Sequence, residues 1–266
     1  MGARFLQYEE PAATGHFIEF RNVCKAFDDH LVLDDVSFFV DLGETCVIMG
    51  RSGVGKSVTL KHILGFLRPD SGRVLVAGED ITDWTEDQLA EIRRRVTMVF
   101  QSGALFDSLT VEENIAFPLE KRTNLTEEQK ESRVAELAEM LEVTDVADKL
   151  PSELSTGTKR AVAIARALAQ DPEAILYDEP TTMVDPLMAA HTGDLILRLK
   201  EKFHKTSVVV THDTHLAKKL ADRIVFLHEG RVAYFGAWTG FVAAPEPFLR
   251  NFLRQDELIP ELDVTT

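Results

Sequence analysis

The sequence predicts an α/β fold in which short apolar strands alternate with helices and a helical section interrupts the alternation. The strand-like segment ETCVIMG, residues 44–50, leads into a glycine-rich turn and then into the helix-like segment KSVTLKHILGFL. Further along, AILYDE, a helical pattern over residues 186–203, and SVVVTH repeat this alternation. Between the two parts, residues 102–170 show helical spacing. An α/β core with a helical insertion therefore accounts for the pattern.

Length and composition set the number of domains and exclude some partners. With 266 residues, of which 45% are hydrophobic and 27% charged, the chain can bury a large core as one domain or as two small ones. We expect an extension over residues 1–16, one core domain over residues 17–240 with the insertion at about 102–170, and a tail over residues 241–266. The formal charge of −15 disfavours nucleic-acid binding, which depends on neutralising phosphates.

Individual segments support these elements in chain order. HFIEFRNV and LVLDDVSFFV are rich in aromatic and β-branched residues and are separated by a polar turn, so we expect an antiparallel pair. ETCVIMG does not alternate, which is typical of a strand covered on both faces. RIVFLHEG and RVAYFG predict a hairpin around Glu229-Gly230. Three capping boxes mark helix starts: Thr85 with Gln88, Thr110 with Glu113, and Thr126 with Gln129.

Two features bear on the compartment. Cys24 and Cys46 lie in strand-like segments, and we expect unpaired thiols in a reducing environment. The longest uninterrupted apolar run covers residues 161–165, whereas a membrane-spanning helix needs about 20 mainly apolar residues. The N-terminal stretch MGARFLQYEEPAATG has no apolar region that would direct secretion. We therefore expect a cytoplasmic protein.

The most specific motif is the segment GRSGVGKS, residues 50–57. It matches the phosphate-loop pattern of Gly, four residues, Gly, Lys and then Ser or Thr, and it lies between a predicted strand and a predicted helix. Glycines let backbone N–H groups surround a polyphosphate, the helix N-terminus favours an anion, Lys56 adds a mobile charge and Ser57 offers a hydroxyl to Mg²⁺. The alternative, a turn that merely joins strand to helix, does not account for the complete match.

Polar residues at the ends of two further strands are candidates for the chemistry. Asp178 and Glu179 follow AILY, at the strand end where open α/β sheets place ligands. Asp178 can bind Mg²⁺, and Glu179 can take a proton from attacking water. His212 ends SVVVTH and is a candidate contact to the γ-phosphate. For each, a solvated or capping residue is the alternative, and a metal pair of His212 with His215 lacks further ligands at suitable spacing.

With these motifs in this order, residues 17–240 resemble the ATP-binding subunit of an ABC transporter. The resemblance implies a P-loop NTPase fold of the ABC type: a RecA-like core with an antiparallel β subdomain and a helical subdomain. It also implies binding of ATP and Mg²⁺, and a dimer of two copies in which each copy completes the site of the other.

The resemblance assigns roles to individual positions. Phe27 in CKAFDD matches the aromatic that stacks on adenine, and Asp185 matches the aspartate of the D-loop. Ser155 and Gly157 match the signature motif that binds the nucleotide of the second copy. The nucleotide loop comprises Gly50, Arg51, Ser52, Gly53, Val54, Gly55, Lys56 and Ser57. The implied catalytic residues are Lys56, Gln101, Glu179 and His212, and the implied Mg²⁺ ligands are Ser57, Gln101 and Asp178.

Two positions depart from the pattern of the family. The stretch SELSTGTKRAVAIARAL, which predicts a helix apolar on one side and basic on the other, has Thr156 and Thr158 where the signature usually has Gly and Gln. In TTMVDP, Met183 stands where Gly is common. Because glycine is used where φ must be positive or where backbones approach closely, we expect both changes to affect closure of the dimer. Neither change removes a residue that performs chemistry.

A closer resemblance is to ATPases of bacterial Mla/Mce-type lipid transport systems. It rests on VFQSGALFDSLTVEENIAFPL, residues 99–119, which matches the pattern QxGALFxxxxVxxNxAxPL of that family. It implies integral membrane permease subunits, an MCE-domain lipid-binding protein and, in some systems, a STAS-domain accessory subunit. It also implies a place on the cytoplasmic face of the bacterial inner membrane. We interpret Ala104, Leu105 and Phe106 as a docking patch for a permease helix, with simple core packing as the alternative.

Two other functions remain open from the sequence. One is a soluble ABC ATPase that serves an assembly pathway such as Fe–S cluster biogenesis, against which the docking patch argues. The other is a module that clamps on ATP without useful turnover, which Thr156 and Met183 suggest.

Overall fold

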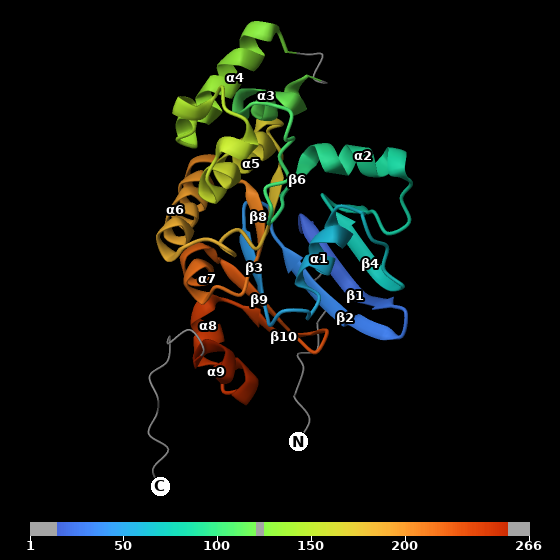
Figure 1. Ribbon diagram of the computed structural model, residues 1–266. Coiled ribbons are helices and arrows are strands. Elements are labelled where there is room, and N and C mark those ends of the chain that lie inside the picture. The colour runs from blue at the N-terminus through green and yellow to red at the C-terminus, as the bar shows by residue number, and fades with distance from the viewer. Residues whose placement is uncertain (1–14, 121–124, 255–266) are drawn as a thin grey trace. The chain divides into compact units, whose positions relative to one another are not determined.

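The computed structural model describes residues 15–120 and 125–254, which fall into two compact units (Figure 1). Of the described residues, 15–83 and 210–254 form the first unit, and 84–120 and 125–209 form the second. These units are defined by contacts within the chain. The functional boundaries expected from the sequence, at residues 16, 102, 170 and 240, stay a prediction.

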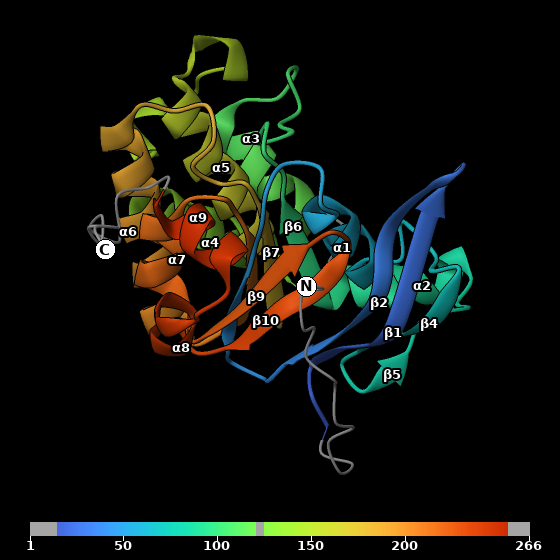
Figure 2. The same cartoon turned by 90° about the horizontal axis from the view of Figure 1, so that it is seen from below.

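The first unit contains a four-stranded antiparallel sheet in the order β2-β1-β4-β5 (Figure 2). Its strands are β1 (Ile18–Phe27), β2 (His30–Val40), β4 (Ser71–Val76) and β5 (Glu79–Asp80). Ile18 lies opposite Val40 on one side and Val76 on the other. The stacked rings of Phe20 and Phe38, with centroids 4.7 Å apart, are fully buried. The expected antiparallel pair is confirmed, whereas β4 and β5 were not predicted.

The same unit contains β3 (Thr45–Met49), every residue of which is buried, as its non-alternating sequence predicts. β3 pairs in parallel with β9 (Arg223–His228), and β9 forms the expected hairpin with β10 (Arg231–Gly236). At the tip of the hairpin, Glu229 and Gly230 have φ values of 50° and 77°, as a turn that follows the twist of the strands requires. Its helices are α1 (Lys56–Ile63), α7 (Thr214–Leu220), α8 (Trp238–Ala243) and α9 (Pro247–Arg254).

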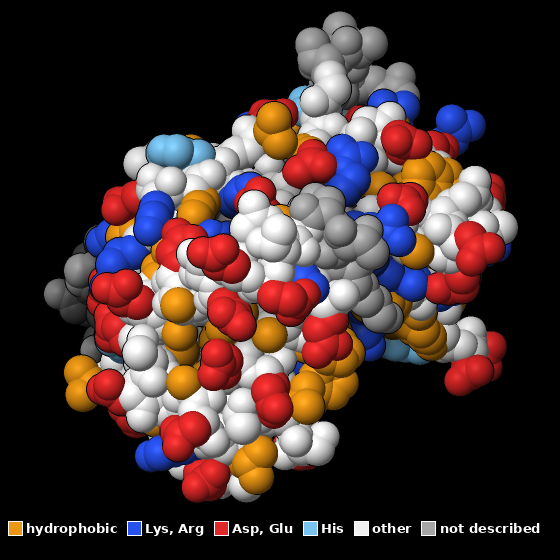
Figure 3. Space-filling view, turned by 90° about the horizontal axis from the view of Figure 1, so that it is seen from above, with side chains coloured by type: hydrophobic (Ala, Val, Ile, Leu, Met, Phe, Trp, Pro, Cys, Tyr) orange, Lys and Arg blue, Asp and Glu red, His pale blue; other side chains and the backbone are white. Residues whose placement is uncertain are grey.

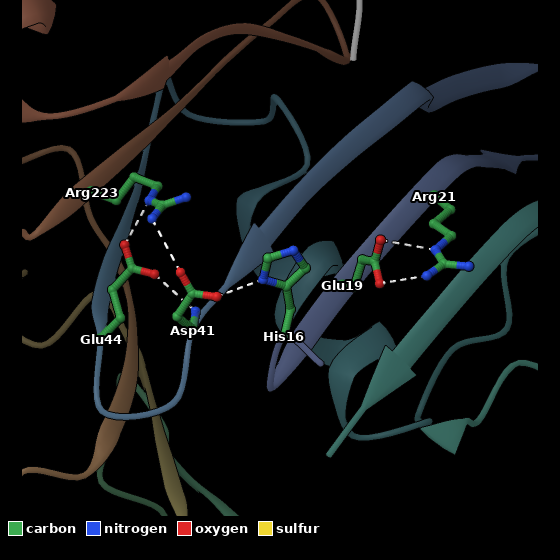
Figure 4. A network of polar contacts seen from close by, with 6 residues as sticks. All are labelled: His16, Glu19, Arg21, Asp41, Glu44 and Arg223. Carbon is green, nitrogen blue, oxygen red and sulfur yellow. Dashed lines mark hydrogen bonds and ion pairs between the residues drawn. The ribbon is translucent and has the colours of Figure 1, made fainter. Parts of the chain in front are cut away.

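A polar network joins the ends of β2 and β9 in the first unit (Figure 4). Arg223 Nε lies 2.6 Å from Glu44 Oε1, and Arg223 Nη2 lies 3.3 Å from Asp41 Oδ2. Asp41 in turn contacts His16 Nδ1 at 2.5 Å. The guanidinium also lies over the ring of Phe39, 4.4 Å from its centroid. The network anchors the start of β9, and therefore the register of β9 against β3.

The second unit contains β6 (Val96–Val99) and β7 (Ala174–Asp178), which pair in parallel, and all but the last residue of β8 (Thr206–Val210), in the order β8-β7-β6. Its α-helices are α2 (Glu86–Arg95), α3 (Val111–Ala116), α4 (Glu127–Met140), α5 (Thr156–Ala169) and α6 (Pro186–Phe203). Short 3₁₀ turns, η1 (Phe117–Leu119), η2 (Thr144–Val146) and η3 (Pro151–Glu153), connect them. α5 packs against α3, α4, α6 and β6. β6 and most of α2 were not predicted from the sequence.

The capping boxes form where the sequence places them. Glu113 Oε2 accepts from Thr110 N at 2.7 Å while Thr110 Oγ1 accepts from Glu113 N at 3.2 Å. Thr126 and Gln129 make the same exchange at the start of α4. Each box satisfies backbone donors that a helix N-terminus leaves unpaired. Both helices therefore begin at the residues that the capping boxes predict.

The surface agrees with the composition. On the face shown in Figure 3, Asp and Glu side chains are spread widely and are interleaved with Lys and Arg. No helix within residues 15–120 and 125–254 combines the length and the apolar character that crossing a membrane requires.

The two thiols differ in their surroundings, which gives a first test of the structure. Cys46, in the middle of the buried strand β3, is fully covered, and its burial raises the pKa of the thiol because the thiolate would be desolvated. Cys24 is half-buried on β1. We expect a maleimide at neutral pH to alkylate Cys24 first and Cys46 only after denaturation, as mass spectrometry of digested samples will show. Equal labelling of the folded chain would contradict the burial of β3.

Candidate active site

The glycine-rich loop of residues 50–57 joins β3 to α1 in the first unit. Gly50, Gly53 and Gly55 have φ values of 147°, 82° and 102°, a region that side chains disfavour. A Cβ at Gly50 would lie 2.5 Å from Leu227 O, whereas a Cβ at Gly53 would meet nothing within 4 Å. At position 50, glycine is therefore required both because a side chain would collide with Leu227 O and because φ is positive. At position 53, only the positive φ requires it.

Lys56 lies across this loop. Its Nζ donates to Gly50 O at 2.9 Å and to Arg51 O at 3.1 Å, and the residue is only 6% exposed. Gly55 occupies the N-cap position of α1, and no side chain among the described residues caps this helix end. Backbone donors, a helix N-terminus and a held ammonium group therefore surround one point, which fits the chemistry of a polyphosphate.

Two more predicted residues belong to the first unit. Phe27 ends β1, has 41% of its surface exposed and lies under Lys25 Nζ, which is 5.6 Å from the ring centroid. His212 is exposed, and its neighbour Thr211 donates its N–H to Ile48 O of β3 at 3.1 Å. Since β3 leads directly into the glycine-rich loop, this bond places the histidine segment beside the strand that carries the loop.

In the second unit, Gln101 and the acidic pair follow neighbouring strands. Val99 of β6 pairs with Tyr177 of β7, so Gln101 and Asp178 both lie at the carboxyl ends of these parallel strands. Open α/β sheets bind their ligands at the carboxyl ends of their strands. Glu179 comes next, has φ of 49°, and accepts a hydrogen bond at Oε2 from Thr182 Oγ1 at 2.9 Å. The structure therefore brings these three predicted residues to the same end of the strands.

The signature stretch forms the N-terminus of α5. Ser155 is the N-cap: its Oγ accepts from Thr158 N at 3.1 Å and lies 2.8 Å from Thr158 Oγ1. Thr156 and Gly157 are not among the residues with positive φ, so the backbone does not require glycine at either position. A Cβ at Gly157 would instead meet Met188 Cε at 2.0 Å, the mobile end of a side chain. A positive φ is therefore not the reason for glycine at position 156, and an effect of Thr156 on dimer closure stays a prediction.

The other departure, Met183, lies at a position with a left-handed backbone. Met183 has φ of 63° and is 84% exposed. A left-handed conformation costs a non-glycine residue about 1–2 kcal/mol, so the preference of the family for glycine at this position has a backbone cause. Asp185 begins the next helix, where its side chain accepts from Met188 N at 3.0 Å as the N-cap of α6. Asp185 thus has a structural role in addition to the predicted one.

The basic side expected for α5 is not a solvent-facing surface. Arg160 is 3% exposed and donates to Pro180 O and Thr182 O, and its burial lowers the pKa of the guanidinium. Arg166 donates to Ala104 O at 2.9 Å and to Gly103 O at 3.3 Å, and burial lowers its pKa as well. Both arginines bind backbone carbonyls because helix α5 is packed on several sides.

The segment after Gln101 is held by one buried amide. Asn114 of α3 is fully buried, and its Oδ1 accepts from Phe106 N at 2.9 Å. Its Nδ2 lies 2.9–3.1 Å from the carbonyl oxygens of Phe106, Leu109 and Thr110, which share its two N–H donors. Phe106 is 42% exposed, packs on Phe117 and lies under the Arg166 guanidinium, 5.5 Å from its Cζ. The asparagine of the 99–119 motif therefore fixes a loop that presents an apolar ring.

The sequence did not indicate four of these residues as part of the site. Arg160, Arg166 and Met188 looked like ordinary helix residues, and Thr182 looked like a loop residue. Only their positions in the fold reveal what they touch. No cluster of three or more His, Cys, Asp or Glu able to hold a metal occurs in the described part of the chain.

Comparison with known proteins gives a consistent family. The profile of the ABC transporter family matches residues 33–182, more than half of the chain. A probable ribonucleotide transport ATP-binding protein of Mycobacterium leprae is 34% identical over 246 residues, 92% of this chain and 71% of that protein. The intermembrane phospholipid transport ATP-binding protein MlaF of Haemophilus influenzae is 38% identical over 239 residues, 90% of each chain. A methionine import protein, MetN of Brucella abortus, is 36% identical over 253 residues, 95% of this chain and 68% of that protein.

A solved structure agrees with the sequence relatives. The ATP-binding cassette MJ0796, in a dimeric post-hydrolysis state bound to ADP and Pi, has a TM-score of 0.75 and 34% identity, covering 83% of this chain and 98% of that one. The predicted fold class, an ABC-type P-loop NTPase with a RecA-like core and antiparallel and helical parts, is confirmed. From the phosphate loop, the family match and these relatives, it follows that the chain belongs to the ABC transporter family as an ATP-binding and ATP-hydrolysing protein.

Proposed function

We propose that this chain is the ATP-hydrolysing subunit of a bacterial Mla/Mce-type transporter that moves phospholipid or another lipid between membranes. The observation that carries the proposal is the loop of residues 102–110, in which Asn114 holds the backbone and Phe106 is presented to solvent. The 99–119 motif belongs to the lipid-transport family, and the similarity to MlaF supports the same cargo. The similarity to ribonucleotide and methionine transport proteins keeps other cargoes as alternatives.

The proposed partners follow from the same loop. An exposed aromatic ring on a rigid loop suits an apolar helix of an integral membrane permease subunit, which would hold the chain on the cytoplasmic face of the inner membrane. An MCE-domain protein on the far side and a STAS-domain accessory subunit remain predictions from the resemblance. A second copy of the chain would place Ser155 and Gly157 against the nucleotide of its neighbour.

Hydrolysis divides the work among the predicted residues. Phe27 would stack on the adenine, while the loop amides and Lys56 hold the phosphates. Glu179 would accept a proton from the attacking water, and His212 would contact the γ-phosphate. The hydroxyl of Ser57, the amide oxygen of Gln101 and the carboxylate of Asp178 are the hard oxygen donors that Mg²⁺ prefers. When bound, the ion would neutralise charge on the transferring phosphoryl group.

Phe27 provides a test of nucleotide recognition. Stacking contributes equally before and during the reaction, so replacing Phe27 with Leu should raise the KM for ATP about three- to tenfold and change kcat less. The measurement is steady-state ATPase kinetics over a range of ATP concentrations. Leu31, which is exposed on the neighbouring strand, offers a control as Leu31→Ala. If KM stays unchanged in Phe27→Leu, the ring serves packing only.

The cargo can be tested on the complex purified through this chain. We expect a multi-spanning protein to co-purify from detergent-solubilised membranes and phospholipid to be extracted from the complex. In detergent micelles, added phospholipid should stimulate ATP turnover, and neither methionine nor a ribonucleotide other than ATP should do so. A chain that purifies without a membrane protein would instead favour a soluble assembly ATPase, and stimulation by methionine would identify a different importer.

A further inference from the structure

The chain reverses direction directly after Asp178, in a turn formed by residues 179–182. Glu179 at φ 49° and Met183 at φ 63° both have left-handed backbones, although neither is glycine. Each such residue costs folding free energy and persists only where the surroundings hold it. Between them lie Pro180 and Thr181, both buried, and the half-buried Thr182. The contacts that hold this reversal therefore also determine where the side chain of Glu179 points.

Arg160 provides two of these contacts. From inside α5, its Nη1 donates to Pro180 O at 2.7 Å and its Nη2 donates to Thr182 O. One planar guanidinium is thus hydrogen-bonded to two carbonyls of the reversal that are two residues apart. The partners of Arg160 among the described residues are carbonyls, and its Nε has no partner there. Burying a cation in this way lowers the stability of the fold. What the arrangement provides in return is a fixed position for the two carbonyls, because the guanidinium is planar and its N–H donors have a rigid, forked geometry.

Thr182 connects the backbone held by Arg160 to the carboxylate of Glu179. Its backbone N–H donates to Glu179 O at 3.2 Å, which closes the turn, and its Oγ1 donates to Glu179 Oε2 at 2.9 Å. A hydroxyl that donates to an ionised carboxylate forms a charge-assisted bond that orients it. The backbone of Thr182 is bound by Arg160 while its side chain binds Glu179. Neither residue needs to touch ATP to influence the proposed base.

We propose that Thr182 and Arg160 are positioning residues for ATP hydrolysis: Arg160 fixes the backbone reversal, and the Thr182 hydroxyl orients the carboxylate of Glu179 toward its water. This inference rests on the proposed role of Glu179 as the general base. In this inference the hydroxyl of Thr182 orients Glu179, and the volume of the side chain does not matter. A serine at position 182 can therefore replace the threonine, and an isosteric valine cannot.

The test compares Thr182→Val and Thr182→Ser in the full chain, purified with the membrane complex that it co-purifies with. Loss of one charge-assisted hydrogen bond to the base should lower kcat about tenfold in Thr182→Val. The KM for ATP should stay within about twofold, because the loop of residues 50–57 is untouched. Thr182→Ser should recover most of kcat. Thr192→Val is a matched control, since Thr192 Oγ1 donates only to a helix carbonyl, Met188 O.

A double mutant separates this role from general damage to the fold. In a Glu179→Gln background the hydroxyl has no base to orient, so Thr182→Val should cause no further loss of kcat. Arg160→Lys keeps the charge but loses the fork, and we expect it to lower kcat with KM again unchanged. Thermal unfolding of each variant identifies chains that fail to fold, and for these the Thr182 series decides.

The possible outcomes are distinct. A Thr182→Val kcat equal to that of wild type, or above it, overturns the inference, and so does a Thr182→Ser variant as slow as Thr182→Val. In both cases the proposed function stands if Glu179→Gln is inactive and wild type is not. If wild type is no faster than Glu179→Gln, it is the assignment of Glu179 as the base that fails.

Discussion

Replacing Glu179 with Gln is expected to lower the ATP turnover of the complex by at least a hundredfold while leaving ATP binding intact. A general base contributes on the order of 10²–10⁴ to a rate, and glutamine has the shape of glutamate without its basicity. Glu179 lies directly beyond β7, at the edge that also carries Asp178 and Gln101. Single-turnover hydrolysis and equilibrium binding of ATP, measured separately, provide the check.

The control for this experiment is Glu173→Gln. Glu173 precedes β7 at the other end of the strand, where Arg95 hydrogen bonds lower the pKa of its carboxyl group. The pair is partly exposed to solvent, so its loss should affect stability slightly and turnover not at all. Wild-type turnover in Glu179→Gln, with normal binding, would mean that the chain clamps on ATP or uses another base.

Replacing Asn114 with Ala is expected to destabilise the chain by about 3 kcal/mol and to release the membrane partner. The substitution removes a fully buried amide whose one acceptor and two N–H donors make four contacts with the backbone, and each buried backbone group left unpaired costs about 1–3 kcal/mol, partly recovered by entering water. The loop that presents Phe106 would then lose its support. Urea unfolding of the chain and co-purification from membranes measure the two effects separately.

Two further substitutions sharpen this prediction. Glu112→Ala, on the exposed side of the same helix, should change stability by less than about 0.5 kcal/mol and leave the complex intact. Phe106→Ala should keep the loop folded but weaken co-purification, because the exposed ring is the proposed contact. If Phe106→Ala retains the partner and Asn114→Ala does not, the asparagine acts on stability and the docking surface lies elsewhere.

Elements with a local signal could be predicted from the sequence. β3 was recognised because a strand buried on both faces does not alternate, and α3 and α4 because their capping boxes are purely local. β6 has four residues and owes its existence to pairing with β7, nearly 80 positions further along the chain. β4 opens with Ser71-Gly72, a poor strand former, and is stabilised by β1. Such non-local pairing leaves no mark in the strand itself.

The candidate site could likewise be predicted only where its residues lie in a local sequence motif. The phosphate loop and the acidic pair stand next to apolar strands, so their position and their chemistry could be inferred together. Arg160 and Thr182 could not, because a basic residue on a helix and a threonine in a turn are commonplace until the fold places one against the other. Asn114 was visible within the 99–119 motif, but its four backbone contacts depend on a loop path that residue types do not determine.

Helix α5 connects parts of the second unit that would otherwise be separate loops. Arg160 and Arg166 are six positions apart, which at about 100° per residue directs them roughly 120° apart around the helix axis. One binds the reversal at residues 180–182 and the other binds the backbone at residues 103–104. A rotation of α5 about its axis would have to break one set of bonds or carry both segments with it. The loop of residues 102–110, Ser155 and the reversal beside Glu179 should therefore move as a single rigid block, so that a force applied at Phe106 reaches Glu179 without any loop having to fold or unfold.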